Sequence, residues 1–139
     1  MDDTAESTVD RIRTIVENDR LIRHFGMTVD EASEGYARVS VEVREDFLNV
    51  HDTAHGALVF ALADVAFAIT VNSIVDAMGV QWSFNILRSA RAGDVLTAEC
   101  SIVHRGSRLL VVGYTVKKGD GVLVAQGQAT ALPVRNTAR

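Results

Sequence analysis

The chain has a single cysteine, Cys100, among its 139 residues. One thiol cannot form an intrachain disulfide, which is typical of proteins from reducing compartments. The N-terminal stretch from Met1 to Glu6 has neither a basic leader nor an apolar secretion segment. These absences predict a cytoplasmic protein, and the strand-like surroundings of Cys100 favour a small buried thiol over a nucleophile.

An excess of positive charge is also missing. Lys and Arg number 14 against 18 Asp and Glu, so the formal net charge is -4 and the pI is about 5.5. Nucleic-acid phosphates are bound by a basic face, so we expect no nucleic-acid partner. With 139 residues, 47% hydrophobic and 23% charged, the chain is long enough for one core, and we predict a single domain over residues 1–139.

Charge is scarcest between Asp52 and Asp76, where Asp64 is the only formally charged side chain. Asp64 lies in the most apolar stretch of the sequence, from Ala54 to Val75. An unpaired, ionised carboxylate that leaves water costs several kcal/mol. Asp64 must therefore be solvated by a partner chain, by water in a cleft, by a bound substrate or by the solvated rim of a buried helix.

The same stretch is nearly long enough to span a bilayer. It is rich in alanine and carries His55 and Asn72 near its ends. Asp64 stands at its centre, where an acidic residue costs about 2.5 to 3.5 kcal/mol on insertion scales. We therefore expect a buried helix of a globular protein and no association with a membrane.

An N-terminal amphipathic helix is predicted from Ser7, a weak N-cap with Asp10 three residues later, to an end near Phe25. From Tyr36 the apolar period changes to two, with valine at alternate positions up to Val43, which indicates a half-buried strand. Further strands are expected at residues 27–31, as a short one, and at 79–87, 94–103, 109–117 and 122–132, with hairpin turns at 105–107 and 118–121.

The central helix begins at His55-Gly56 and is apolar on every side, which indicates that other elements surround it. Strands that follow one another through tight turns pair antiparallel, which leaves one sheet with one face for this helix. The sequence therefore predicts an α+β protein with the hotdog fold. In this fold an antiparallel β-sheet wraps around a long central α-helix, here preceded by the N-terminal amphipathic helix.

Several short motifs together are similar to one enzyme family. They are Leu48-Asn49, His55-Gly56-Ala57, Phe60, Leu62-Ala63-Asp64, Ala66-Phe67-Ala68, Asn72-Ser73, Leu87-Arg88, Ala92-Gly93-Asp94 and His104-Arg105-Gly106. With them the chain resembles the hotdog-fold acyl-CoA thioesterases, nearest to the branch associated with phenylacetic acid degradation, over most of the sequence from Gly26 to Leu132. The resemblance implies hydrolysis of an aryl-acetyl, benzoyl or medium-chain acyl-CoA. No metal or cofactor is expected, because coenzyme A is part of the substrate.

The resemblance implies catalytic roles for Asn49, Gly56 and Asp64, which match the family's positions. The Gly56 N–H at a helix start suits an oxyanion site, because helix-start amides lack partners and glycine allows close approach. Asp64 serves either as general base on a water or as nucleophile, and Asn49 orients the water or the carboxylate. His55 is a candidate base, although a structural cap is favoured. Ala57 stands where the family usually has a second glycine, which predicts altered acyl selectivity.

Geometry adds a constraint on the catalytic pair. Gly56 and Asp64 are eight residues apart, so one helix separates them by about 12 Å along its axis and roughly 80° around it. One carbonyl carbon cannot readily be served by both. Two antiparallel helices related by a two-fold axis would pair Gly56 of one chain with Asp64 of the other. We expect a homodimer with active sites at its interface, and the resemblance implies that dimers pair into tetramers.

Substrate-binding residues are predicted less sharply. Guanidinium groups suit the phosphates of coenzyme A, although ordinary solvated turns explain each arginine equally well. Core packing is the alternative for the aromatic candidates of an acyl pocket. The CoA-binding candidates are Arg88, Ser89, Arg105, Gly106, Ser107 and Arg108, and the acyl-pocket candidates are Ala57, Phe60, Phe67 and Trp82.

Two other functions remain open from the sequence. A hotdog hydratase or dehydratase acting on acyl-CoA would use His55 as base together with a carboxylate. A non-catalytic acyl-CoA-binding protein would also bury Asp64, but it gives no reason for a spacing that lets a two-fold axis pair Asp64 with Gly56.

Overall fold

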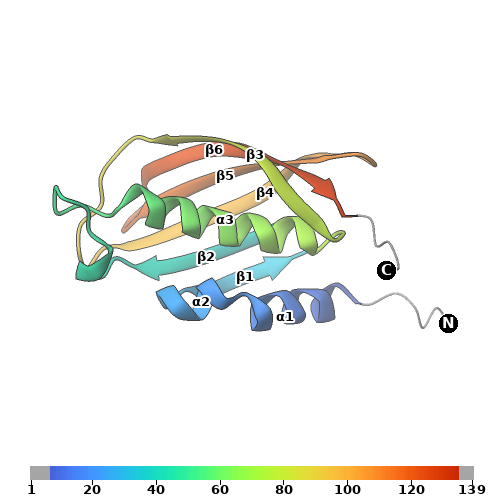
Figure 1. Cartoon of the computed structure of the whole chain (residues 1–139), viewed down its shortest axis with the longest axis horizontal. Helices are drawn as coiled ribbons and strands as arrows, with labels where there is room; N and C mark the ends of the chain where they lie inside the picture. The colour runs from blue at the N-terminus through green and yellow to red at the C-terminus, as the bar shows by residue number, and fades with distance from the viewer. Residues whose placement is uncertain (1–6, 135–139) are drawn as a thin grey trace.

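The 17-residue helix α3 (Gly56–Asn72) lies in the curve of a six-stranded antiparallel sheet (Figure 1). The computed structural model describes residues 7–134, so the expectation for residues 1–6 lies outside the described part. The strands are β1 (Thr28–Ser33), β2 (Tyr36–Glu42), β3 (Ala77–Ile86), β4 (Val95–Arg105), β5 (Leu110–Lys118) and β6 (Val122–Pro133). The predicted hotdog arrangement is confirmed, and the expected strands agree with these to within a few residues.

The strand order in the sheet is β1-β2-β4-β5-β6-β3. Tight turns connect β4, β5 and β6 as predicted, and each pairs antiparallel with the next. The strand that follows the central helix, β3, instead pairs with β6 at the far edge of the sheet. Within the described residues, the outer side of β3 therefore has no strand partner.

The N-terminal helix is divided, and the prediction of one continuous helix to Phe25 is wrong at Asp19. Helix α1 (Thr8–Asn18) ends there, because Asp19 has extended backbone angles and its N–H closes on the Ile15 carbonyl. The Asp19 carboxylate then accepts from the Leu21 N–H and caps α2 (Arg20–Phe25). A short polar side chain at Asp19 thus ends one helix and starts the next.

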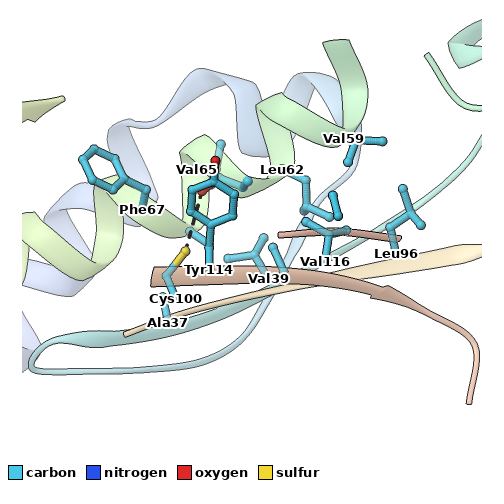
Figure 2. Packing of buried hydrophobic residues seen from close by; sticks show 14 of the residues in the cluster. Ala37, Val39, Val59, Leu62, Val65, Phe67, Leu96, Cys100, Tyr114 and Val116 are labelled. Atoms are coloured by element: carbon cyan, nitrogen blue, oxygen red, sulfur yellow. Dashed lines mark hydrogen bonds between the residues drawn. The ribbon is translucent and has the colours of Figure 1, made fainter. Parts of the chain in front are cut away.

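One side of α3 packs against the concave face of the sheet. Figure 2 shows Leu62 and Val65 of the helix above side chains of the central strands, among them Val39 and Val116. Cys100 lies in this core, with its Sγ 3.8 Å from the Ala63 carbonyl oxygen. The expected buried thiol is confirmed, and burial raises the pKa of the Cys100 thiol far above its usual value.

A hydrogen bond beneath the helix holds β3 in place. The Tyr114 hydroxyl on β5 reaches past β6 and donates to the Ser83 carbonyl on β3. The crossing is possible at Gly127 of β6, where an added Cβ would lie only 1.8 Å from the Ser83 oxygen.

Within residues 7–134, no helix is long and apolar enough to cross a membrane.

Replacing Tyr114 by Phe should lower the free energy of unfolding by about 1–3 kcal/mol, because the Ser83 carbonyl would lose its donor in a partly buried place. The matched control is Tyr36→Phe, whose hydroxyl donates to Glu99 at 2.9 Å. Tyr36 is less buried than Tyr114, and water can hydrate the Glu99 carboxylate when the hydroxyl is removed, so the loss should be smaller, about 0.5–1 kcal/mol. Urea unfolding of both variants measures the difference, and equal losses would contradict the role given to Tyr114.

Candidate active site at the start of the central helix

The first turn of α3 offers an unpaired backbone donor. His55 is the N-cap, and its carbonyl accepts from the N–H groups of Leu58 and Val59 at 2.9 and 3.3 Å. The Ala57 N–H donates to His55 Nδ1 at 3.0 Å. The Gly56 N–H has no acceptor among the described residues. It therefore lies at the positive end of a long helix, ready for an oxygen that carries developing negative charge.

The cap also defines what His55 can do. A neutral imidazole has one ring nitrogen that accepts and one that carries a proton. Because Nδ1 accepts from Ala57, the proton of the neutral ring is on Nε2. Neither nitrogen of this neutral, capping ring has a free lone pair, and the structure places His55 as a backbone cap.

The loop before the helix is built around Asn49. Its Oδ1 accepts from the His51 N–H at 2.9 Å and from both the N–H and the hydroxyl of Thr53, each at 3.2 Å. These bonds use the acceptor of the side chain, while its Nδ2 has no partner among the described residues. Asn49 is thus held by its oxygen and can donate from its nitrogen to a water or a carboxylate.

Asn49 and Gly56 face the same space. A hollow of about 280 Å³, here called the polar hollow, lies between the loop, the helix start and the end of β3. It brings together the predicted residues Asn49, Gly56, Arg88 and Ser89. Its other lining residues are Thr53, Ala54, Val59, Ile86, Leu87 and Ala90. A larger hollow of about 500 Å³ elsewhere on the sheet is lined by none of the predicted site residues, so volume alone does not identify the site.

Sequence reasoning missed Thr53, which holds Asn49 in position. The signal was present, because an asparagine followed by a threonine in a short polar loop is typical of side-chain-to-backbone turns. Sequence reasoning also missed Ile86, since nothing in the sequence shows that the end of β3 lies beside the helix start. A Cβ added to Gly56 would lie 3.2 Å from Ile86 Cδ1, so the space at this amide is narrow.

Asp64 lies two turns further along α3 and does not line the polar hollow. It is half-buried, and no hydrogen bond or ion pair to it is found among the described residues. Burial raises the pKa of its carboxyl, and the negative charge of Asp19 raises it further. Within one chain, Asp64, the only acidic residue of α3, therefore lies apart from the donors of Gly56 and Asn49.

The predicted CoA-binding residues fall at opposite ends of the molecule. Arg88 and Ser89 line the polar hollow at the start of α3. Arg105, in contrast, has its Nη2 4.0 Å from Glu34 Oε1. The next residue, Gly35, donates its N–H to Ser73 just after the end of α3. A 17-residue helix is about 25 Å long, so the turn that carries Arg105, Gly106, Ser107 and Arg108 does not form one cationic patch with Arg88 in a single chain.

Three of the four acyl-pocket candidates pack against one another. The Trp82 ring makes edge-to-face contacts with Phe60 and Phe67, with each pair of ring centres 5.6 Å apart. These contacts fill the space between α3 and β3, as expected for core packing. Ala57, the fourth candidate, is exposed at the helix start. No cluster of three or more potential metal ligands is found within residues 7–134.

Replacing Asp64 by Asn should stabilise the fold at neutral pH. A carboxyl whose folded pKa is raised binds its proton more tightly when folded, so its ionisation costs stability as pH rises through that folded pKa. Asn cannot ionise, and we expect a melting temperature higher by on the order of a few degrees at pH 7.5. The gain should shrink as the pH falls towards the ordinary pKa of an aspartate.

Thermal melts between pH 4.5 and 7.5 measure this, with Asp120→Asn on the exposed β5–β6 turn as control. The control should change the melting temperature little at any of these pH values. A variant Asp64→Asn that is less stable at pH 7.5 would show that the ionised carboxylate gains more from donors of a second subunit than its burial costs, and would contradict the prediction.

The geometry described above can be compared with known proteins. The model of the thioesterase superfamily matches residues 51–125. A putative esterase of Archaeoglobus fulgidus is 31% identical over 91% of this chain and 83% of its own length. The acyl-coenzyme A thioesterase PaaI of Escherichia coli is 37% identical over 66% of each chain.

The fold agrees with these matches. The solved structure of the E. coli PaaI protein from the phenylacetic acid degradation operon superposes with a TM-score of 0.90 and 29% identity, over 94% of this chain and 95% of that one. Family, sequence relatives and architecture point the same way. The chain belongs to the thioesterase superfamily, as a thioester hydrolase of the PaaI type with the hotdog fold.

Proposed function

We propose that this protein hydrolyses the thioester of an aryl-acetyl, benzoyl or medium-chain acyl-CoA, at sites shared between two subunits. The observation that carries the proposal is the unpaired Gly56 N–H, which opens into the same hollow as Asn49 and Arg88. An unpaired acid stands apart from them on the same helix. The similarity to the E. coli acyl-coenzyme A thioesterase PaaI supports the substrate class.

In the proposed reaction the thioester carbonyl oxygen accepts from the Gly56 N–H. Charge that develops on this oxygen is stabilised by the amide and by the helix dipole. Asp64 of a second subunit either removes a proton from the attacking water or attacks the carbonyl carbon itself, forming a mixed anhydride that water then opens. The carbon–sulfur bond breaks in both routes, and CoA leaves as a thiol with the free acid as the other product.

A two-fold axis provides the missing acid. If Gly56 of one α3 faces Asp64 of an antiparallel copy, the residue halfway between them, Phe60, lies nearest to the axis. Ala57 and Ala68, which lie outside the sheet-facing side of the helix, are small enough for two helices to approach closely. The open edge of β3 flanks this surface, so a second sheet could continue the first.

The same symmetry explains the divided CoA-binding residues. In an antiparallel pair, the end of α3 in one subunit lies near the start of α3 in the other. The turn with Arg105 and Arg108 of one chain would then approach Arg88 of its partner chain. Guanidinium groups from both chains would surround the phosphates of one substrate. Pairing of such dimers into a tetramer remains a prediction from the family resemblance.

The alternatives have less support. A hydratase or dehydratase would need His55 as base, and its ring nitrogens are used by the helix cap and by its own proton. A non-catalytic binding protein would not need an acid with a raised pKa two turns from an unpaired amide. Both features are instead what hydrolysis requires.

Release of CoA thiol from a panel of aryl and straight-chain acyl-CoAs tests the function. The wild type should release thiol from at least one of them, and Asp64→Asn should lower kcat roughly 10²–10⁴-fold by loss of the base or nucleophile. The control variant Asp120→Asn should keep wild-type rates.

Two results would count against the proposal in different ways. A wild type that releases no thiol from any ester would refute the enzyme function. Full activity of Asp64→Asn would refute the mechanism and leave the function standing. Water addition to an enoyl-CoA, measured by loss of its ultraviolet absorbance, would favour the hydratase alternative.

A further inference from the structure

A second hollow lies on the other side of the helix start. Its volume is about 210 Å³, and we call it the apolar hollow. Its apolar lining residues are Phe25, Phe47, Leu48, Ala57 and Leu58. Two polar residues, Asp46 and His55, complete it. The two hollows meet the helix start at consecutive residues, because Gly56 lines the polar one while His55 and Ala57 line the apolar one.

The N-terminal helices form one wall of the apolar hollow. Helix α2 ends at Phe25 because Gly26 adopts a left-handed conformation with φ of 70°, and its N–H bonds back to Arg23 and Ile22. The Met27 N–H also donates to the Ile22 carbonyl, at 2.8 Å. This tight end of the helix fixes the position of Phe25 beside the loop that precedes α3.

The adjoining wall is a 3-10 turn, Glu45–Phe47. The rings of Phe25 and Phe47 meet edge to face, 5.4 Å between centres and 86° between planes. Arg44 stacks on Phe47 at 4.1 Å and pairs with Asp46 at 3.1 Å. The Phe47 ring is therefore held between Arg44 and Phe25, which favours a defined shape over a flexible gap.

The chemistry of the two hollows differs across the Gly56 amide. The polar hollow offers a guanidinium, a hydroxyl and an amide donor to the CoA side of a thioester. The apolar hollow offers mainly aromatic and aliphatic surface, which favours an apolar ligand group that leaves water. A thioester whose carbonyl lies at Gly56 would thus place its CoA end in the polar hollow and its acyl end in the apolar hollow.

The volume of the apolar hollow limits which acyl groups it can bind. An apolar cavity of about 150 Å³ binds benzene, so about 210 Å³ accommodates one aromatic ring with a short arm or a chain of similar volume. The Ala57 methyl is part of this wall, which gives a physical reason for altered selectivity at the position where the family usually has glycine.

We propose, on the basis of the function given above, that the acyl group binds in the apolar hollow and that Phe25 and Phe47 determine its selectivity. This assigns the N-terminal helical segment to the active site as its specificity wall. It also moves the acyl site away from Phe60, Phe67 and Trp82, whose rings pack against one another beside β3. Of the residues expected in the acyl pocket, only Ala57 keeps that role.

Steady-state kinetics on benzoyl-CoA, phenylacetyl-CoA and straight-chain acyl-CoAs of increasing length test the proposal. Phe25→Leu and Phe47→Leu keep apolar packing while they open the hollow, and Leu48→Trp fills it. The variants that open the hollow should prefer a longer acyl chain than the wild type does. The variant that fills it should prefer the shortest acyl chain. The kcat/KM ratio between neighbouring substrates should change about 10-fold or more, as one methylene does in apolar pockets.

The matched control is Phe84→Leu, the same chemical change on the other flank of α3, where Phe84 contacts Phe60 at 5.5 Å. It should keep the wild-type order of substrates. If Phe84→Leu reorders the substrates while the Phe25 and Phe47 variants do not, the acyl group binds at the aromatic cluster and the proposal is overturned. An equal loss on every substrate in the Phe25 and Phe47 variants, with the order unchanged, would overturn it as well.

These outcomes are separate from those of the proposed function. A wild type that hydrolyses acyl-CoAs, with variants that keep its substrate order, leaves the function standing and removes the specificity wall. A wild type that hydrolyses none removes both. Circular dichroism of each folded variant, taken before the assays, ensures that only native protein enters the comparison.

Discussion

A fixed separation on one rigid helix governs this structure. Gly56 begins α3 and Asp64 follows two turns later, and burial of the helix against the sheet leaves neither free to move toward the other. Helical geometry keeps them about 12 Å apart along the axis. Any reaction that needs both groups at one carbonyl carbon must therefore take one of them from another chain. The proposed dimer rests on this spacing.

The chemistry of the polar hollow also calls for an acidic group from elsewhere. His55 and Asn49 both use their acceptor atoms to hold backbone groups in place. What remains for the polar hollow are donors: the Gly56 amide, the Asn49 nitrogen and the Arg88 guanidinium. Donors stabilise an oxyanion, but they cannot activate water. A half-buried carboxylate with a raised pKa is the complementary group, and the chain carries it on the exposed side of the same helix.

Local patterns predicted the elements well, because each has its own period. The alternation from Tyr36 and the uninterrupted apolar run after Gly56 gave β2 and α3 with nearly the right bounds. The capping bond of Asp19 divided the first helix, and an aspartate inside an amphipathic pattern does not reveal that competition in advance. The pairing of β3 with β6 was also hidden, since the helix that precedes β3 allows either edge of the sheet.

The candidate site shows a similar limit. Asn49, Gly56 and Arg88 were identified by motif, and the structure brings them to one hollow. The apolar hollow could not be found this way, because Phe25, Phe47 and Ala57 come from three separate elements that only tertiary packing brings together. The split between Arg88 and Arg105 was likewise invisible, because turns at opposite ends of a sheet look alike in sequence.

Complementation between subunits tests the shared site most directly. Gly56→Val, whose side chain would crowd Ile86 beside the amide, and Asp64→Asn should each be inactive alone. After the two are unfolded together and refolded, half of the dimers are mixed and each mixed dimer has one intact site, so about a quarter of wild-type activity should return. If the mixture stays as inactive as its parents while mixed dimers are present, both groups act within one chain, and the shared site is contradicted.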